Sequence, residues 1–318
     1  GKRANGFFGV GSIFHTDGLA CFWSPQQANL FLFMSSHDPR LRTDYDSEHR
    51  VTDADRELLP DTQNADSGAI KGAPVSVQRV GASHFRLPMK IVREDGSWNQ
   101  LETSVTGTVK LGAGVRGINM SRILRTFYAH KEEPVRLEGL RTILERIREE
   151  VRSEEADLQL SFSYPIERDS LRSGMQGYQY YDVVYEGFLG PEGFRPRLQL
   201  DFVYSSACPG SSELAEHARA EREVYAIPHS QRSRARVSVE LDPAVEFSIE
   251  GLHRICLEAL QTEVQVMVRR EDEQAFAELN GAYTKFVEDA ARLLYAGLDS
   301  VEAIRDFRVV CVHLESLH

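Results

Sequence analysis

The sequence predicts an α+β protein made of two similar modules in tandem, each an antiparallel sheet with helices on one face. Stretches in which apolar and polar residues alternate come in groups, and this alternation is the pattern of half-buried strands. Stretches with an apolar residue every three or four positions lie between these groups, as in amphipathic helices. The order strands, helices, strands occurs twice along the chain, and this order is typical of α+β architecture.

The first module is expected over residues 59–190, after a polar extension at 1–58 that contains at most short helical turns. Its first two strands are predicted at 75–92 and 101–111, and they pair with each other. A helix begins near Met120, with Asn119 or Ser121 as its cap. A second helix follows Pro134 and carries one apolar stripe as far as Val151. Two more strands are predicted around 158–162 and 180–188.

The second module is expected over residues 191–318 and repeats this plan. Its strands are predicted at 198–204, 235–241 and 307–315. Its helices are predicted at 211–223, 249–260, around 275–279 and at 286–298. The two modules share the order of their elements rather than obvious sequence identity.

Composition narrows the class of protein. The chain has 318 residues, of which 42% are hydrophobic, and this is enough to bury a full core. The net charge of −11 argues against a nucleic-acid binder. The four cysteines form no CxxC pair, so we expect no disulfide scaffold and a reducing, cytoplasmic compartment. No apolar run is as long as a membrane span.

One thiol and one imidazole flank a short charged insertion in the second module. Cys208 follows a predicted strand directly, and Pro209 and Gly210 make a sharp turn that would present its sulfur. Together with His229 and a carboxylate, this thiol would make a three-ligand metal site with an open position for water. Lone cysteines and histidines are more often buried structural residues, so the spacing alone leaves both interpretations open.

Charged residues nearby have two interpretations as well. The run Glu271, Asp272, Glu273 is either a source of the carboxylate ligand or a solvated helix start favoured by the dipole. Glu315 ends an apolar strand face, where a carboxylate needs a partner such as the N–H pair of a guanine ring, unless the strand has reached solvent. Arg232, with the arginines two and four residues later, shares one strand face that could hold a triphosphate or form a solvated edge.

Taken together, these blocks resemble the type IB GTP cyclohydrolase I family, whose members have the tunnelling fold. The resemblance extends over residues 59–318, and eight blocks occur in the family's order. They are Leu59–Gln63, Val80–Pro88, Arg116–Arg122, Cys208–Pro209, His229–Ser233, Arg270–Glu273, Lys285–Asp289 and Glu315–His318. One block alone is a weak signal, but this number in one order is specific.

The resemblance implies hydrolysis of GTP at C8 to formate and 7,8-dihydroneopterin triphosphate by a homotetramer with sites at subunit interfaces. It implies one divalent metal, zinc, iron(II) or manganese, on Cys208, His229 and Glu273, with Glu271 as the fallback ligand. It also implies that Glu315 anchors the guanine and that His318 exchanges protons. The residues it implies for catalysis are His229, Glu315 and His318, and those for substrate binding are Arg122, Gln231, Arg232, Ser233 and Glu315.

The chain departs from the family pattern at several positions. Gly210 stands where the family has a second cysteine, and Asn119 stands where it has a histidine. The segment between Cys208 and His229 is longer than in the family. Two alternatives therefore stand beside the full reaction. One is a relative that stops at ring opening or acts on another purine, and the other is a purine-binding homologue without activity.

Overall fold

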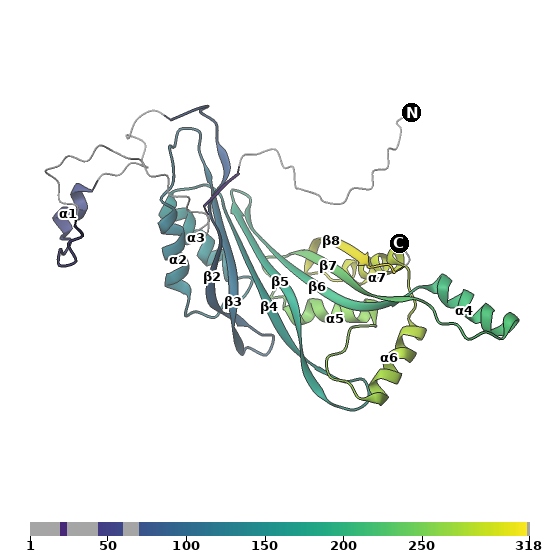
Figure 1. Ribbon diagram of the computed structural model, residues 1–318. Helices are drawn as coiled ribbons and strands as arrows, with labels where there is room; N and C mark the ends of the chain where they lie inside the picture. Colours follow the sequence, from purple (N-terminus) through teal and green to yellow (C-terminus); the bar gives the residue numbers. More distant parts are fainter. Residues whose placement is uncertain (1–19, 24–43, 60–69, 317–318) are drawn as a thin grey trace, which may run out of the picture.

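The computed structural model describes residues 20–23, 44–59 and 70–316 (Figure 1). Seven strands of this described part form one continuous antiparallel sheet in sequence order. They are β2 (Val77–Val92), β3 (Trp98–Leu111), β4 (Ala156–Asp169), β5 (Gln176–Gly190), β6 (Gly193–Ala207), β7 (Ser230–Leu241) and β8 (Ile304–His313). A short strand, β1 (Ala20–Trp23), runs parallel beside β2.

Two pairs of helices cover one face of this sheet (Figure 1). Helices α2 (Met120–His130) and α3 (Leu140–Val151) pack on β2, β4 and β5. Helices α5 (Ile249–Leu260) and α7 (Val287–Asp299) pack on β6 and β8. Because each pair lies between two groups of strands in the chain, the predicted α+β class, with helices on one face, is confirmed.

The core lies between the sheet and these helices. Strand β4 shows why, because its buried positions alternate from Ala156 through Leu158 and Leu160 to Phe162. Helix α3 turns Leu140, with the apolar residues three and four positions further along, toward the same layer. Burial of one such side chain contributes about 1.5–3 kcal/mol, so the two periodicities hold each helix against its strands.

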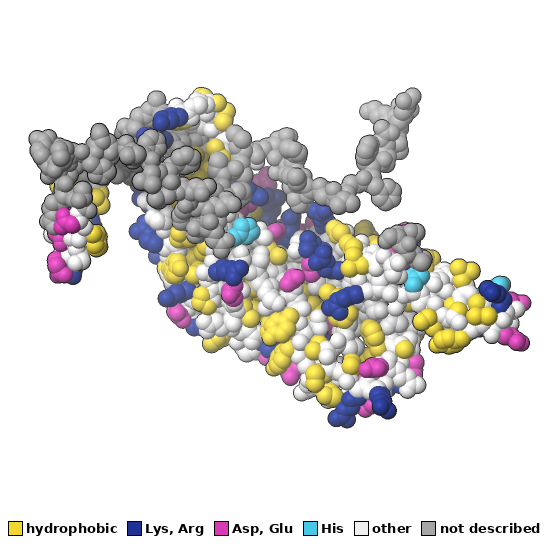
Figure 2. All heavy atoms as spheres, viewed as in Figure 1, with side chains coloured by type: hydrophobic (Ala, Val, Ile, Leu, Met, Phe, Trp, Pro, Cys, Tyr) yellow, Lys and Arg dark blue, Asp and Glu magenta, His cyan; other side chains and the backbone are white. Residues whose placement is uncertain are grey.

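Three further helices of the described part lie outside this layer. Helix α1 (Asp53–Leu58) begins at a Thr52 capping box in the N-terminal extension. Helix α4 (Pro209–Arg222) projects from the end of the sheet, and α6 (Arg270–Ala282) precedes α7 (Figure 1). Apolar side chains are exposed along α4 and the segment after it (Figure 2); Leu214 is 71% and Tyr225 is 83% exposed.

The segment that follows α5 takes the place of β5 beside the last part of β6. Pairing between β5 and β6 extends to Val183 and Leu200. Beyond it, Ser205 N–H donates to Thr262 O over 2.8 Å, and Tyr204 bridges to Glu263. Strands β5 and β6 therefore separate beyond this point, although the sheet as a whole stays continuous. The end of β6 pairs instead with the segment that leads into α6.

The buried side chain of Glu263 ties the segment after α5 to β4 and β5. Its carboxylate is 3% exposed and lies 2.6 Å from His253 Nε2 and 3.0 Å from Arg168 Nε. The Tyr181 hydroxyl also donates to it. Burial opposes its ionisation, but the hydrogen bonds from His253 and Tyr181 hold the pKa of Glu263 below its usual range. A charged carboxylate is thus stable in the core because His253, Tyr181 and Arg168 each direct an N–H or O–H group at it.

The predicted element bounds differ from the observed ones mainly at strand ends. Strands β4 and β5 extend well beyond the predicted 158–162 and 180–188. The last strand ends at His313, so Glu315 lies just beyond it rather than within it. Asn119 is the cap position of α2, but its side chain makes no cap hydrogen bond. No helix of the described residues is both long and apolar enough to cross a membrane.

Candidate functional site

The chemistry-bearing residues from 208 to 315 meet where β6 and β8 end and β7 begins. Cys208 follows β6 as the N-cap of α4, and His229 immediately precedes β7. The backbone N–H of Cys208 donates to His229 O over 3.2 Å, so the two residues are neighbours across adjacent strands. Pro209 suits the first position of α4 because an N–H there would have no helical partner. The sequence therefore turns sharply at the thiol.

The imidazole of His229 is oriented by two oxygen atoms. Its Nδ1 lies 3.2 Å from Glu315 Oε1 and 3.2 Å from Gln231 Oε1. When Nδ1 carries the proton, its N–H can donate a hydrogen bond to either oxygen. In this tautomer the lone pair is on Nε2, as a metal-binding histidine requires. The His229 backbone N–H donates to Ser211 Oγ over 3.2 Å, which also ties it to α4.

A hydrogen-bonded row of side chains continues from His229 into the protein. Gln231 Nε2 donates to Ser206 Oγ over 3.0 Å, and Ser206 Oγ lies 2.7 Å from Ser233 Oγ. Both serines are buried. Because its nitrogen is used by Ser206, the amide of Gln231 must present its oxygen to His229. The row therefore fixes the histidine from behind.

The start of α7 closes this region from the helix side. Lys285 N–H donates to Ala207 O, one residue before Cys208. Lys285 is 4% exposed, and its ammonium donates to Thr262 Oγ1 over 3.1 Å and to Tyr283 O over 2.5 Å. No ion pair within the described residues involves it, and burial lowers its pKa to about 8. A nearly buried cation thus stands directly behind the thiol-bearing turn.

A second imidazole lies on the same face of the sheet. His313 pairs with Ser233 across β7 and β8, and its Nε2 lies 2.9 Å from Tyr204 Oη. Burial lowers the pKa of His313, and the positive charge of Lys285 lowers it further, while Glu288 and Glu315 oppose both effects. The site therefore combines a thiol, two imidazoles, two carboxylates and one ammonium group.

The structure brings together part of the predicted site. Cys208, His229, Gln231, Ser233 and Glu315 meet at this end of the sheet. His318 lies outside the described residues. Arg232 projects to the opposite, exposed face because side chains alternate along β7. The arginines that share this face bind Asp201, and Arg236 does so through two hydrogen bonds of 2.8 Å.

Two other predicted residues are placed elsewhere within one chain. Arg122 lies in α2 and donates to Glu150 O over 2.7 Å, far from α4 (Figure 1). Glu273, like Glu271, is exposed in the first turn of α6. Its neighbour Asp272 anchors this turn to the N–H of Ser173 over 2.9 Å. Among the described residues no group of three or more His, Cys, Asp or Glu side chains is arranged to hold a metal ion.

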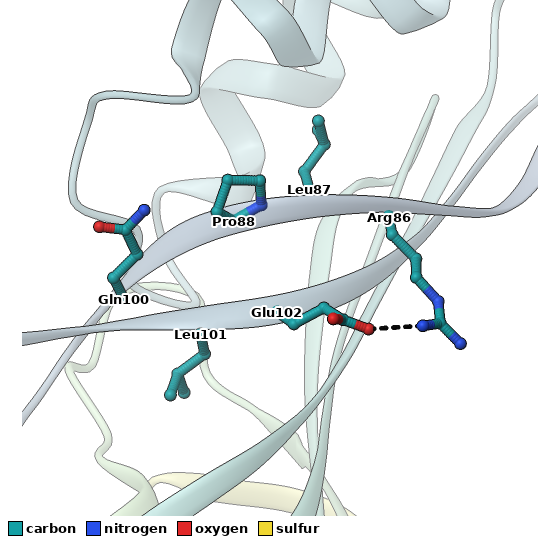
Figure 3. Close-up of a pocket in the computed structure, with 6 residues that line it drawn as sticks. All are labelled: Arg86, Leu87, Pro88, Gln100, Leu101 and Glu102. Atoms are coloured by element: carbon teal, nitrogen blue, oxygen red, sulfur yellow. Dashed lines mark hydrogen bonds and ion pairs between the residues drawn. The ribbon is translucent and has the colours of Figure 1, made fainter.

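A separate depression lies between β2 and β3 in the first module (Figure 3). Arg86 and Glu102 point toward each other there and form a hydrogen bond of 2.7 Å. Both side chains are mostly exposed, at 70% and 69%. An exposed ion pair of this kind contributes little to the stability of the fold. The depression is also remote from Cys208.

Sequence reasoning missed the residues that form the back of the site. Tyr204, Ser206 and Thr262 carry no motif and come into place only because of the strand register and the segment after α5. Lys285 lies in the block Lys285–Asp289, but the sequence predicted no function for it. His313 lies within the strand predicted at 307–315, but the position of Lys285 opposite it could not be read from spacing.

The element order and the site together define a tunnelling-fold protein. The described part contains two strand–helix–strand units in one sheet, with all four packed helices on one face. A polar cluster with a thiol and imidazoles at strand ends is the kind of site that an enzyme uses.

Comparison with known proteins identifies the family. The family model described as "Type I GTP cyclohydrolase folE2" matches residues 59–318. A GTP cyclohydrolase FolE2 of Dinoroseobacter shibae is 49% identical over 297 residues, covering 92% of this chain and 81% of that relative. The protein of the same name in Roseobacter denitrificans is 50% identical over 282 residues, covering 88% and 77%. The chain belongs to the type I GTP cyclohydrolase folE2 family.

Solved structures with a similar arrangement include uricases. The uricase of Arthrobacter globiformis has 9% sequence identity and a TM-score of 0.48, covering 77% of this chain and 82% of its own. A thermostable variant of such a uricase gives 10% identity and the same TM-score of 0.48.

Proposed function

We propose that this chain is a metal-dependent GTP cyclohydrolase I of type IB. It would hydrolyse GTP at C8, release formate and form 7,8-dihydroneopterin triphosphate. Membership of the family and the names of relatives at about half identity support this function. The structural observation that carries it is the pairing of Cys208 with His229 on adjacent strand ends, with Glu315 against the imidazole.

The donor set fits a divalent metal ion. Cys208 supplies a soft thiolate, and His229 supplies Nε2 because its Nδ1 faces Glu315 and Gln231. A zinc, iron(II) or manganese ion held there would supply Lewis-acid activation of water. The proposed carboxylate ligand is Glu273, with Glu271 as the fallback.

The placement of Glu273 and Arg122 away from Cys208 within one chain supports an assembly of several copies. We infer a homotetramer in which subunit interfaces complete each site, so that residues from neighbouring copies reach the metal and the substrate. Arg122, Gln231, Arg232 and Ser233 are then proposed contacts of GTP. Glu315 is the proposed partner of the guanine ring, and His318 the proposed proton-transfer group.

Within one chain, four side chains around His229 have clear tasks. Gln231 and Glu315 orient His229 and fix the protonation of its Nδ1. Ser206 and Ser233 hold Gln231 in the orientation this requires. Removing such supporting contacts typically costs 10–100-fold in metal affinity or activity. We also place the protein in the cytoplasm, where the free thiol of Cys208 stays reduced.

The test is an anaerobic incubation of the protein with GTP and each of the three metals. Formate release and, after oxidation, pterin fluorescence would be followed. Cys208→Ala should abolish both products and the bound metal. The matched control is Cys256→Ala, which removes a buried thiol of α5. This variant should still form both products and bind the metal.

The outcomes separate the competing functions. Formate and pterin together support the full reaction. Formate without pterin favours a relative that stops at ring opening, in line with Asn119 and Gly210 at positions where the family has other residues. GTP binding without formate, unaffected by Cys208→Ala, favours a purine-binding homologue. Activity only with another purine would overturn the choice of GTP.

A further inference from the structure

His313 is a second imidazole in the site that the proposed function does not use. It is the last residue of β8 and lies beside Ser233, on the face of the sheet that α7 covers. Its side chain is partly accessible, unlike the fully buried Tyr204 beneath it. An imidazole in this position can contact a bound substrate, while its hydrogen bond to Tyr204 keeps the ring in place.

The contact with Tyr204 orients the ring of His313. The two rings meet edge to face with centroids 5.7 Å apart, and His313 Nε2 lies 2.9 Å from Tyr204 Oη. The Tyr204 hydroxyl is also within hydrogen-bonding reach of the Cys311 thiol. If Tyr204 donates to that sulfur, its oxygen accepts the proton of His313 Nε2. His313 Nδ1 then carries the lone pair and can exchange protons with a substrate.

The charged groups around His313 come from two segments. Lys285 and Glu288 approach from the start of α7, and Glu315 approaches from the chain just after β8. Cys311 and Tyr204 are the titratable neighbours within the sheet. Burial and Lys285 lower the pKa of His313, which keeps the imidazole neutral and ready to accept a proton near neutral pH.

The multi-step reaction transfers protons at more than one stage, so a second acid–base group besides the proposed His318 has a role to fill. His229 is engaged through Nδ1 with Glu315 and Gln231, and its other nitrogen is the proposed metal ligand. Asn119 cannot carry a proton at neutral pH, and it lies at the start of α2 in the first module. Within the described part of the site, His313 is the imidazole that stays available for acid–base chemistry.

We propose that His313 is an acid–base catalytic residue for the hydrolysis of the formamide C–N bond in this reaction; this rests on the proposed cyclohydrolase function. The oxygen of a water molecule bonds to the formyl carbon while His313 Nδ1 takes one proton from that water. The C–N bond then breaks, and the leaving nitrogen takes the proton from His313. Formic acid departs and ionises to formate, so no oxidant or further reactant is needed.

The test compares His313→Asn with the wild type in metal-loaded protein. An acid–base residue contributes about 10²–10⁴-fold, so kcat for formate release should fall by about this factor while KM for GTP changes less than about threefold. A ring-opened formamide should accumulate and be detectable by mass spectrometry. The limb of the kcat–pH profile below neutral pH, which reports protonation of the base, should disappear.

Two further variants separate catalysis from support of the fold. His217→Asn removes an exposed imidazole of α4 and should leave kcat and its pH profile unchanged. Tyr204→Phe keeps His313 but removes its orienting contact, so it should lower kcat less than His313→Asn and keep the acidic limb. Thermal unfolding of each variant reports whether the fold is intact.

The possible results are distinct. A folded His313→Asn protein with wild-type kcat, or with a reduced kcat and an unchanged pH profile, would overturn the role of His313 and leave the cyclohydrolase function standing. A wild-type protein that releases no formate with any of the metals would overturn both. Formamide accumulation with loss of the acidic limb supports the proposal.

Discussion

Replacing Lys285 with methionine should make the protein more stable near neutral pH. Lys285 is 4% exposed, and within the described residues its ammonium makes no ion pair and donates hydrogen bonds to two neutral atoms, Thr262 Oγ1 and Tyr283 O. A buried charge without a counter-charge is costly. Methionine has a similar length and no charge, so Lys285→Met removes this cost and keeps most of the packing.

The magnitude follows from the pKa of Lys285, which burial lowers from 10.5 to about 8. One pH unit corresponds to about 1.4 kcal/mol, so the protonated form destabilises the folded state by about 3 kcal/mol relative to the unfolded chain. Loss of the two hydrogen bonds in the variant offsets about 2 kcal/mol. A net gain of about 1 kcal/mol is therefore expected at pH 7.

The sign of the pH dependence is specific. A lysine whose folded pKa is lowered loses its proton in the folded state first, so wild-type stability rises between about pH 8 and pH 10.5. Urea unfolding of nucleotide-free protein at pH 7, 8.5 and 10 measures this. The advantage of Lys285→Met should shrink across the series, and Lys131→Met, an exposed control, should show none. A difference that is constant with pH, or a less stable variant at pH 7, would refute the reasoning.

Three other changes test the fold around the site. Glu263→Gln should lower the free energy of unfolding by about 3–5 kcal/mol at pH 7, because it breaks a buried ionic network; since the pKa of Glu263 is lowered, calorimetry should show the loss shrinking as the pH falls below the usual carboxyl range and through that lowered pKa. Gly81→Ala should prevent folding or shift β2, because its Cβ would lie 2.0 Å from Gly107 O, and circular dichroism would show this. Asp272→Asn should speed hydrogen exchange of the Ser173 amide at least about tenfold, because that N–H loses a carboxylate acceptor.

The layers of the fold could be predicted because they depend on local periodicity. Alternation from Leu158 to Phe162 identified β4, and the apolar stripe from Leu140 identified α3. The predicted range of β4 was too short, although Tyr164 and Ile166 continue the buried alternation. Only beyond Ile166 does the pairing with β5 continue without alternation in hydrophobicity. Strand β1 depends on pairing with a distant segment, and no local pattern reports that.

The candidate site could be predicted only where chemistry is written in short motifs. Cys208 and His229 were found because a turn and a strand start bring residue types of distinct chemistry together. The position of Lys285 depends on the segment after α5, which pairs with the end of β6 where β5 no longer does. This is a contact between distant parts of the chain, so no local pattern predicts it. The exposed side of Arg232 follows from alternation along β7, and the sequence had left a solvated position open as one of two interpretations.

The central claim is that Cys208 and His229 bind one divalent metal from adjacent strand ends. Zinc-edge X-ray absorption of the zinc-loaded protein tests it most directly. The account predicts one sulfur ligand at about 2.3 Å with nitrogen and oxygen ligands at about 2.0–2.2 Å, and loss of the sulfur shell in Cys208→Ala. A first shell without sulfur in the wild type, or a sulfur shell that survives Cys208→Ala, would contradict the account.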